Sequence, residues 1–266
     1  MSSSNADNPA HAKSDPCQFL SWDTAFFGIR IARVIGNSLS LESLDAIEKW
    51  CLDQKIRCLY FPARSDDAIT VALAEQAGFH LVDIRMTFNR YATDTSVSTN
   101  ATSTKLKMQK NDLTFRPAIP SDIPQLKAIA RISHTDTRFF YDAKFEKSMA
   151  ESLYETWIQK SMEGFAQHVL IADIDGKAVG YISCHISKYQ ENQVCNGSIG
   201  LIAVSTEHQG KGIGRNLVAG AMEWFLQNGV STVSVVTQGR NVIAQKLYVS
   251  GGFTPSQLEL YYHRWF

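Results

Sequence analysis

Hydrophobic residues recur along this chain with two different periods, and their alternation predicts a mixture of helices and strands. After about residue 113, short apolar or alternating runs are separated by runs with an apolar residue every three or four positions. The predicted strands are "LTFRPA", the two arms of "HVLIADIDGKAVGYISCHIS" around Asp175-Gly176, "IGLIAV", "STVSVVTQ" and "LELYYHRWF". The predicted helices are "IPSDIPQLKAIARIS", one or two pieces of "YDAKFEKSMAESLYETWIQKSM", the run from Ile213 to Leu226, and "NVIAQKLYVSGGF". This order is typical of an α+β fold with a central sheet.

The N-terminal part repeats the end of the chain faintly. Residues 41–91 and 216–265 both run helix, strand, helix, Gly-Phe, strand, and aligning the two Gly-Phe pairs superposes the elements. We interpret this as a duplicated half-domain; chance is the alternative, because helices and strands alternate in many proteins. The first copy lacks a glycine-rich turn before its first helix, and Ala74 stands where the second has Tyr248. It is therefore not expected to bind a second molecule of the same ligand.

A polar segment divides the chain. Residues 91–112 are rich in Ser, Thr, Asn and Asp and show no hydrophobic periodicity, which predicts a linker or a long exposed loop. We expect a disordered tail over 1–16, a half-size domain over 17–91, a linker over 92–112 and the main domain over 113–266. A length of 266 residues suits one large domain or two modest ones.

Composition narrows the classes of function. Lys+Arg and Asp+Glu both number 26, so the net charge gives no sign of a nucleic-acid or membrane partner. The five cysteines include no C-x-x-C pair, which argues against a disulfide framework or a metal site and fits a reducing cytoplasm. No apolar run reaches about 18 residues, and the polar start lacks the apolar region of a secretory signal. We therefore expect a cytoplasmic protein without a metal.

The stretch "GLIAVSTEHQGKGIGRN" places three glycines beside a lysine and an arginine. It is not a P-loop, because Lys211 is followed by Gly212, and its glycine spacing is not a dinucleotide fingerprint. The glycines join a predicted buried strand to the start of a helix, where free N–H groups and the positive end of the dipole face outward. This arrangement favours a bound anion, above all a phosphate, over a simple glycine-rich hairpin.

These features together resemble the GCN5-related N-acetyltransferases (GNAT). The resemblance rests on the apolar strand, Gln209-x-x-Gly212-x-Gly214, the helix that follows, and an Asn-x6-Tyr pattern ending in Gly-Phe. It covers most of 113–266 and implies a GNAT fold with acetyl-CoA as co-substrate. In that family the glycine turn binds the pyrophosphate, and the preceding strand pairs with the pantetheine arm and holds the acetyl carbonyl. The implied cofactor-binding residues are Ile202, Ala203, Val204, Gln209, Gly210, Lys211, Gly212, Ile213, Gly214, Arg215, Asn241 and Ala244.

A second resemblance spans nearly the whole chain. The stretches "FLSWDTAFFGIRIARV", "RFF" at 138–140 and "ELYYHR" resemble the dTDP-fucosamine acetyltransferases. This implies acetylation of the 4-amino group of dTDP-4-amino-4,6-dideoxygalactose for surface polysaccharide synthesis, and we expect a homodimer. The alternatives are a GNAT enzyme acting on a protein N-terminus or a small amine, and a non-catalytic acyl-CoA sensor.

Acetyl transfer from a thioester to an amine needs an acid for the leaving thiolate and a base for the amine. Tyr248, seven residues after Asn241, is the predicted acid, since a phenol stays protonated at neutral pH. The alternative for Tyr248 is simple packing on an amphipathic helix. Many relatives carry a glutamate on the strand before the glycine turn, but "SIGLIAV" has none. His168, His185 and Glu191 are candidates, although a structural or exposed role explains each of them better. A water chain, or capture of the fraction of substrate that is already neutral, is an equal alternative.

The acceptor site is predicted around Arg138, Phe139, Phe140 and Asp142, with Tyr141 among them. Such a group could stack on a base and pair with a diphosphate. An aromatic core cluster under a helix is the alternative. Trp22, Phe26 and Phe27 invite the same interpretation, but packing between the two halves of the chain explains them better.

Overall fold

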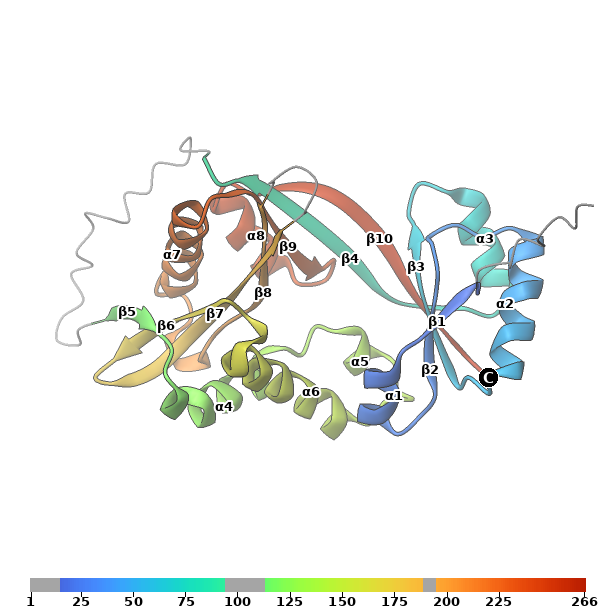
Figure 1. Ribbon diagram of the computed structural model, residues 1–266, viewed down its shortest axis with the longest axis horizontal. Coiled ribbons are helices and arrows are strands. Elements are labelled where there is room, and N and C mark those ends of the chain that lie inside the picture. Colours follow the sequence, from blue (N-terminus) through green and yellow to red (C-terminus); the bar gives the residue numbers. More distant parts are fainter. Residues whose placement is uncertain (1–14, 94–112, 189–194) are drawn as a thin grey trace, which may run out of the picture. The chain divides into compact units, whose positions relative to one another are not determined.

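The computed structural model describes residues 15–93, 113–188 and 195–266 (Figure 1). The helices and strands are β1 (Cys17–Phe19), α1 (Ser21–Phe27), β2 (Ile31–Val34), α2 (Leu41–Asp53), β3 (Cys58–Arg64), α3 (Ala68–Gln76), β4 (His80–Tyr91), β5 (Thr114–Pro117), η2 (Pro120–Asp122), α4 (Ile123–Ser133), α5 (Arg138–Tyr141), α6 (Lys147–Lys160), η3 (Ser161–Phe165), β6 (His168–Ile174), β7 (Lys177–Lys188), β8 (Cys195–Val204), η4 (Thr206–His208), α7 (Ile213–Gln227), β9 (Val230–Gln238), α8 (Val242–Ser250) and β10 (Thr254–Trp265). Every strand and helix predicted after residue 113 is present. The chain forms two compact units, Met1–Leu81 with Tyr261–Phe266, and Val82–Leu260.

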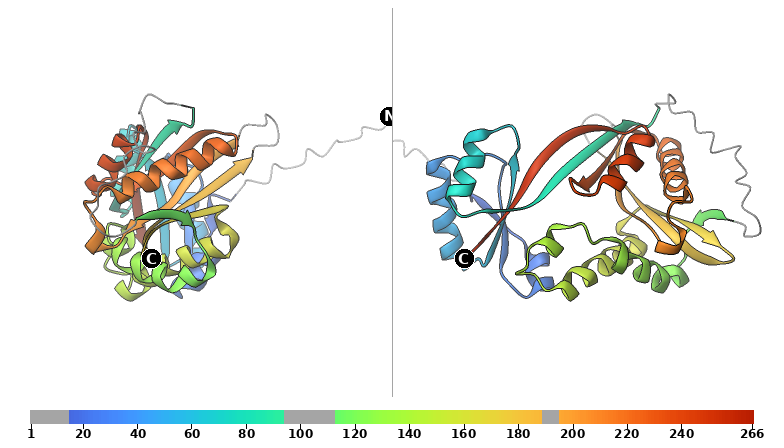
Figure 2. Two further views of the ribbon diagram at one scale, coloured as in Figure 1. Left: turned by 90° about the vertical axis from the view of Figure 1, so that its left-hand side faces the viewer. Right: turned by 180° about the vertical axis from the view of Figure 1, so that it is seen from behind.

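The larger unit is a mixed sheet covered by helices on both faces. Its strand order is β10-β4-β9-β8-β7-β6-β5, in which β8 and β9 are parallel, while β4–β9, β5–β6, β6–β7 and β7–β8 are antiparallel. Figures 1 and 2 show α7 and α8 on one side of this sheet and α4 and α6 on the other. Alternate residues of β7 follow the same division: Ile182 packs in the α7 core, whereas Tyr181 bonds to His134 at the end of α4.

The smaller unit contains β1, β2, β3 and the last residues of β10, with α2 and α3. Strand β1 is antiparallel to β2, and β2 is parallel to β3. Helix α2 begins with a reciprocal cap in which Ser40 and Ser43 each accept a hydrogen bond from the main-chain N–H of the other. The unit thus has its own sheet and its own capped helices.

The two halves of the chain repeat one another in detail. Asp67 caps α3 by accepting the Thr70 N–H, and Asn241 caps α8 by accepting the N–H three residues on. At the other end of these helices, Phe79 N donates to Ala74 O and Phe253 N donates to Tyr248 O, both at 3.0 Å. The glycine before each phenylalanine is left-handed, with φ of 76° and 82°. Matching caps and turns at one sequence offset support the duplicated half-domain.

The final strand of each repeat pairs outside its own repeat. Strand β4 lies antiparallel to β9, from Arg85 opposite Gln238 to Tyr91 opposite Thr232, and the end of β10 joins β3. The division between the units therefore falls within β4 and again within β10, instead of in the polar segment 92–112. The boundary falls within β4 because part of this strand pairs with β9 of the larger unit. The pattern of polar residues does not predict this pairing. Most of the predicted linker and tail lies outside the described residues.

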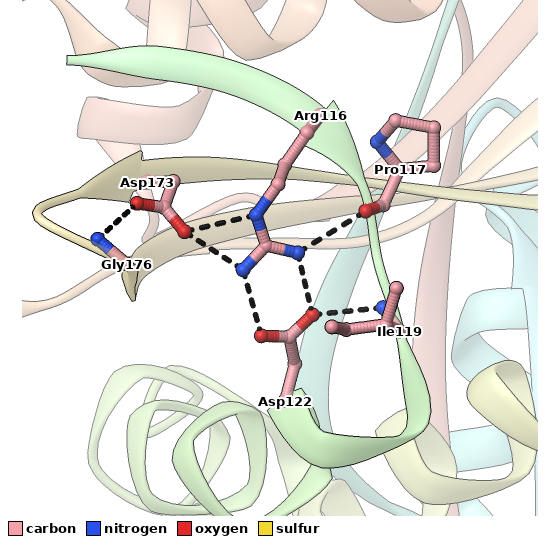
Figure 3. Close-up of polar contacts among 6 residues, drawn as sticks. All are labelled: Arg116, Pro117, Ile119, Asp122, Asp173 and Gly176. Atoms are coloured by element: carbon pink, nitrogen blue, oxygen red, sulfur yellow. Dashed lines mark hydrogen bonds and ion pairs between the residues drawn. The ribbon is translucent and has the colours of Figure 1, made fainter.

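One ion-pair network fixes the edge of the larger unit (Figure 3). The Arg116 guanidinium donates two hydrogen bonds to Asp122, both at 2.9 Å, and two to Asp173, at 2.9 and 2.7 Å. Asp122 also accepts the Ile119 N–H at the start of η2, the turn that precedes α4, and Asp173 accepts the Gly176 N–H in the β6–β7 hairpin. Both carboxylates are buried. Hydrogen bonding to Arg116 lowers the pKa of Asp122 below its usual range. Through its two carboxylate partners, Arg116 on β5 connects this strand to the start of α4 and to the β6–β7 hairpin.

We expect Arg116→Leu to destabilise the protein by about 3 kcal/mol, because two buried carboxylates lose their cation. Urea denaturation at pH 7 would measure this. Arg64→Leu, which breaks an exposed pair with Asp66, is the matched control and should leave the midpoint unchanged. Because the folded pKa of Asp122 is depressed, the difference should be complete above about pH 4 and shrink as the pH falls further. Equal losses in the two variants would contradict this role.

Candidate active site

The parallel pairing of β8 with β9 stops partway along both strands. It runs from Cys195 opposite Val230 to Ile199 opposite Val235 and no further among the described residues. Beyond that point β8 continues on β7, and β9 continues on β4. The two strands therefore separate, and one edge of β8 is left without a strand partner.

The register on β7 decides which main-chain groups face this open edge. Ser205 N donates to Val179 O, so in the antiparallel ladder the main chain of Ala203 also faces β7. The groups of Ile202 and Val204 then point away from β7, toward the open side. The Val204 carbonyl accepts the Gln209 side-chain amide at 3.0 Å, which ties the strand to the turn that follows. Of the three predicted strand residues, two thus offer hydrogen-bonding groups to a ligand.

The glycine turn ends this open edge. Gly210 and Gly212 are left-handed, with φ of 74° and 79°, and Gly212 is the residue before α7. An added Cβ at either glycine would meet no atom of the described chain within 4 Å. Ile213 is buried in the core and anchors the start of α7, while Lys211 and Arg215 are exposed. The turn thus presents free N–H groups of a helix start to open space, flanked by positive charge.

Gly214 has different surroundings from the other two glycines. A Cβ there would lie 3.5 and 3.8 Å from the two methyl groups of Leu247 on α8. The residue therefore lies at the contact between α7 and α8. A Cβ at these distances would make ordinary van der Waals contact, so α8 does not require glycine here, and cofactor binding by Gly214 stays a prediction.

Helix α8 places Tyr248 beside the same core. Asn241 accepts the Ala244 N–H at 3.0 Å, so that N–H is engaged by the cap. The Tyr248 ring is 3% exposed and packs against Phe88 and Phe253 at 6.2 and 6.0 Å between centroids. Burial raises the pKa of Tyr248, which keeps the phenol protonated. Its hydroxyl has no hydrogen-bond partner within the described residues, so it can donate to a ligand.

The opposite face of β7 carries Tyr181, Ser183 and His185. Ser183 Oγ accepts the Leu201 N–H at 2.9 Å, where the β7–β8 register shifts. A Cβ at Gly200 would lie 2.9 Å from that oxygen and would overlap His185 Nε2. Glycine at position 200 therefore lets His185 lie against the main chain of β8 where it leaves β9.

The tautomer of His185 follows from its one hydrogen bond. Its Nδ1 lies 3.2 Å from the Phe165 carbonyl, which can only accept, so Nδ1 carries the proton. Burial lowers the pKa of His185, and the bond to Phe165 opposes this only in part. The imidazole is thus neutral at pH 7 with a lone pair on Nε2, facing Gly200. Sequence reasoning included His185 only as one of several alternatives.

The other predicted bases are placed differently. His168 stacks on Trp224 of α7, with centroids 5.0 Å apart, and therefore lies on the α7 face. Glu191 lies outside the described residues. His134, which the sequence did not suggest, bonds to the Tyr181 hydroxyl at 3.0 Å and stacks on Tyr154. Burial lowers the pKa of His134 to about 4. No sequence pattern distinguishes it, because its partners come from α6 and β7.

The predicted acceptor group is only partly available. Phe139 is buried edge-on to Phe145, so its ring cannot stack on a ligand, and Phe140 is half-buried. Asp142 is buried and accepts the Lys144 N–H. The Arg138 guanidinium lies 4.3 Å from the Phe139 ring centroid. In the smaller unit, the Trp22 and Phe26 rings of α1 stack, and Phe27 meets Phe26 edge to face.

Comparison with known proteins identifies the family. Residues 129–253 match the family model described as acetyltransferase (GNAT) family. These residues form a GNAT acetyltransferase domain. It is 28% identical to the dTDP-fucosamine acetyltransferase of Escherichia coli O6:H1 over 248 residues, 92% of this chain and 94% of that protein. It is also 32% identical to the spore coat polysaccharide biosynthesis protein SpsD of Bacillus subtilis over 149 residues, 56% of this chain. That second match spans half the length of SpsD.

Solved structures agree on the GNAT fold. A tandem GNAT protein from the clavulanic acid biosynthesis pathway matches with a TM-score of 0.59 at 15% identity, over 88% of this chain and 75% of that one. A GCN5-related N-acetyltransferase from Sphaerobacter thermophilus gives 0.58 at 15% identity, over 94% and 76%. Among the described helices none is long and apolar enough to cross a membrane, and the described side chains form no cluster suited to a metal ion.

Gly212→Asp tests whether the turn binds an anion. We expect it to weaken acetyl-CoA binding by about 10- to 100-fold, the loss of one charge-assisted hydrogen bond, with added repulsion from the carboxylate. Gly229→Asp is the matched control, since Gly229 is also left-handed and open but follows the far end of α7. Calorimetry on both folded variants would decide. Unchanged affinity in Gly212→Asp, or an equal loss in both, would remove the turn from the binding site.

Proposed function

We propose that this protein transfers the acetyl group of acetyl-CoA to the amine of a nucleotide-linked amino sugar. The observation that carries the proposal is the open edge of β8, which leads directly into the glycine turn. The pantetheine arm of acetyl-CoA is an extended chain with amide groups, and it fits an unpaired strand edge. Its pyrophosphate then reaches the N–H groups at the start of α7. Two neighbouring features thus match the two halves of one substrate.

The charges around the turn suit the same ligand. Lys211 and Arg215 are exposed on either side of Gly212 and can neutralise phosphates of coenzyme A. The α7 dipole adds positive potential at this end of the helix. The main-chain groups of Ile202 and Val204 remain for the pantetheine amides and the acetyl carbonyl, where an N–H would polarise the thioester.

The proton acceptor and the proton donor lie on opposite faces of the sheet. His185 Nε2, on the α4/α6 face, takes a proton from the amine, directly or through a water. The amine nitrogen forms a bond to the acetyl carbon, and the bond from that carbon to sulfur breaks. Tyr248, on the α7/α8 face, gives its hydroxyl proton to the departing thiolate. The acceptor thus enters from one face while the thiol is protonated from the other.

The nature of the acceptor rests on the relatives. The dTDP-fucosamine acetyltransferase matches over nearly its whole length, and SpsD is named for polysaccharide biosynthesis. We therefore propose a dTDP-linked amino-deoxysugar as acceptor, acetylated at its 4-amino group for surface polysaccharide synthesis. A cytoplasmic homodimer is part of this proposal. Release of free thiol from acetyl-CoA would test it with dTDP-fucosamine, a polyamine and a peptide amine as acceptors. Activity confined to the polyamine or the peptide would overturn the proposed acceptor class.

Tyr248→Phe should lower kcat by about 100-fold, the lower end of general-acid effects, because water can partly replace the lost proton donor. The ring still packs on Phe88 and Phe253, so acetyl-CoA affinity should change less than a few-fold. Single-turnover kinetics would isolate the chemical step. A wild-type rate of chemistry would show that another group protonates the thiolate.

His185→Gln should lower kcat/KM by about 100-fold while leaving acetyl-CoA affinity unchanged. Burial lowers the pKa of His185 below the usual value of about 6.5, so the base stays neutral at that pH and the wild type should remain active there. Activity should fall only at lower pH, as the pH passes through the depressed pKa of His185 and the base becomes protonated. The variant should lack this acidic limb. His168→Gln, on the other face, is the control. A pH–rate profile that keeps its acidic limb in His185→Gln would exclude His185 as the base.

A further inference from the structure

The contacts of Arg240 within the described residues leave one of its buried hydrogen-bond donors without an acceptor. It follows the end of β9 and directly precedes the Asn241 cap of α8. Its Nη2 donates to the Val82 carbonyl at 2.9 Å and lies 3.7 Å from Asp83 Oδ1, both on β4. Its Nη1 is buried and has no hydrogen-bond partner within the described part of the chain. Buried donors are almost always paired in folded proteins, so a missing acceptor points to a group outside the polypeptide.

Tyr141 fixes the plane of this guanidinium. The Arg240 Cζ atom lies 3.5 Å from the centre of the Tyr141 ring. Tyr141 belongs to the four-residue helix α5 and is 57% exposed, whereas the Arg240 side chain is 28% exposed. A stacked guanidinium is held in one orientation while its edge stays available for hydrogen bonding. Because α5 is short and its tyrosine is solvated, a ligand needs to displace little to reach the donor.

Asp83 attracts the Arg240 guanidinium but does not fill its hydrogen-bonding capacity. The Asp83 side chain is 7% exposed, and burial raises its pKa to about 6, an effect that the charges of Arg240 and Arg138 oppose. Arg138 therefore lies close enough to act on the same carboxylate. A guanidinium has five N–H donors, and Asp83 stands beyond hydrogen-bond distance of the nearest one. This cluster thus brings two arginines near one carboxylate, and Arg240 has donor capacity that Asp83 does not fill.

The cluster lies on the face from which the acceptor is proposed to enter. The charges of Asp83 and Arg138 act on Tyr154 of α6. Tyr154 stacks on His134, with centroids 4.6 Å apart, and His134 bonds to Tyr181. Tyr181 is opposite Ala203, beside the open edge of β8. Charge interactions and then direct contacts therefore link Arg240 to the proposed site of acetyl transfer.

We propose that Arg240, held by Asp83 and Tyr141, binds a phosphate of the acceptor's diphosphate group. The inference rests on the proposed function, because a nucleotide-linked sugar brings this diphosphate with it. A planar guanidinium edge suits two phosphate oxygens at once. The pyrophosphate of acetyl-CoA has its own proposed site at the start of α7, so each substrate meets a separate cationic group. Arg240 would then select phosphorylated acceptors over the same amino sugar without phosphate.

Calorimetry with dTDP, the nucleoside diphosphate without the attached amino sugar, tests this directly on the full-length protein. We expect Arg240→Gln to weaken dTDP binding by about 10- to 100-fold, the loss of charge-assisted hydrogen bonds to phosphate. Arg131→Gln, which removes an exposed arginine paired with Glu151 on α6, is the matched control and should bind dTDP as the wild type does. Inorganic pyrophosphate as a second probe separates recognition of phosphate from recognition of the base. Acetyl-CoA affinity should be unchanged in both variants.

Two milder variants keep the test decisive if Arg240→Gln does not fold. Arg240→Lys keeps the charge but loses the planar edge, and Tyr141→Ala removes an exposed ring, so both should fold and bind dTDP several-fold more weakly. Wild-type dTDP affinity in these folded variants would overturn the inference, as would a wild-type protein that does not bind dTDP. A loss confined to acetyl-CoA affinity would also overturn it and assign Arg240 to the cofactor site.

Steady-state kinetics separate this inference from the proposed function. With dTDP-fucosamine as acceptor, Arg240→Gln should raise KM for the acceptor more than it lowers kcat. An active variant with unchanged KM would overturn the phosphate site and leave the acetyltransferase proposal intact. Loss of dTDP binding in the variant, beside a wild type that acetylates no nucleotide-linked amine, would support the phosphate site and reject the proposed reaction.

Discussion

The parallel pairing of β8 with β9 ends at Ile199, and the position of this end sets where every candidate group of the site lies. Up to that residue the two strands satisfy one another's main-chain groups; beyond it, among the described residues, β8 keeps only β7 and β9 keeps only β4 as a strand partner. The unpaired edge of β8 is a defect that a folded protein normally avoids or covers. Here it leads into a turn that also offers unpaired N–H groups, so the two unsatisfied segments form one continuous surface for an extended, phosphorylated ligand.

Two features of the neighbouring strands accompany the separation of β8 and β9. Strand β4 pairs with the other edge of β9 up to Gln238, so β9 keeps one strand partner after it leaves β8. On the other side, the register shift at Ser183 lets a side-chain oxygen accept the Leu201 N–H. Gly200, at the same point, admits the His185 ring. The irregularity that bends the ladder thus also brings a titratable side chain to the place where the strands part.

The N-terminal repeat contributes to the larger unit although it lacks a glycine turn of its own. Its last strand, β4, is the strand that pairs with β9, and it also carries Asp83. The exchange of final strands between the repeats gives the second half a sheet neighbour that its own sequence does not supply. The first repeat is thus needed for the sheet although it has no glycine turn, because removing β4 would leave an edge of β9 unpaired.

The sequence by itself determined the features that depend on a few neighbouring residues. The Asn241 cap, the Asp175-Gly176 hairpin with both residues left-handed, and the left-handed Gly210 and Gly212 all follow from local backbone preferences. Only the tertiary structure decided what long-range pairing controls. Gly214 contacts α8, Phe139 is buried, and Arg240 meets Asp83 because β4 lies beside β9. Hydrogen bonds along a strand edge are made by the main chain, which is alike in every residue, so side-chain patterns leave the choice of partner strand open.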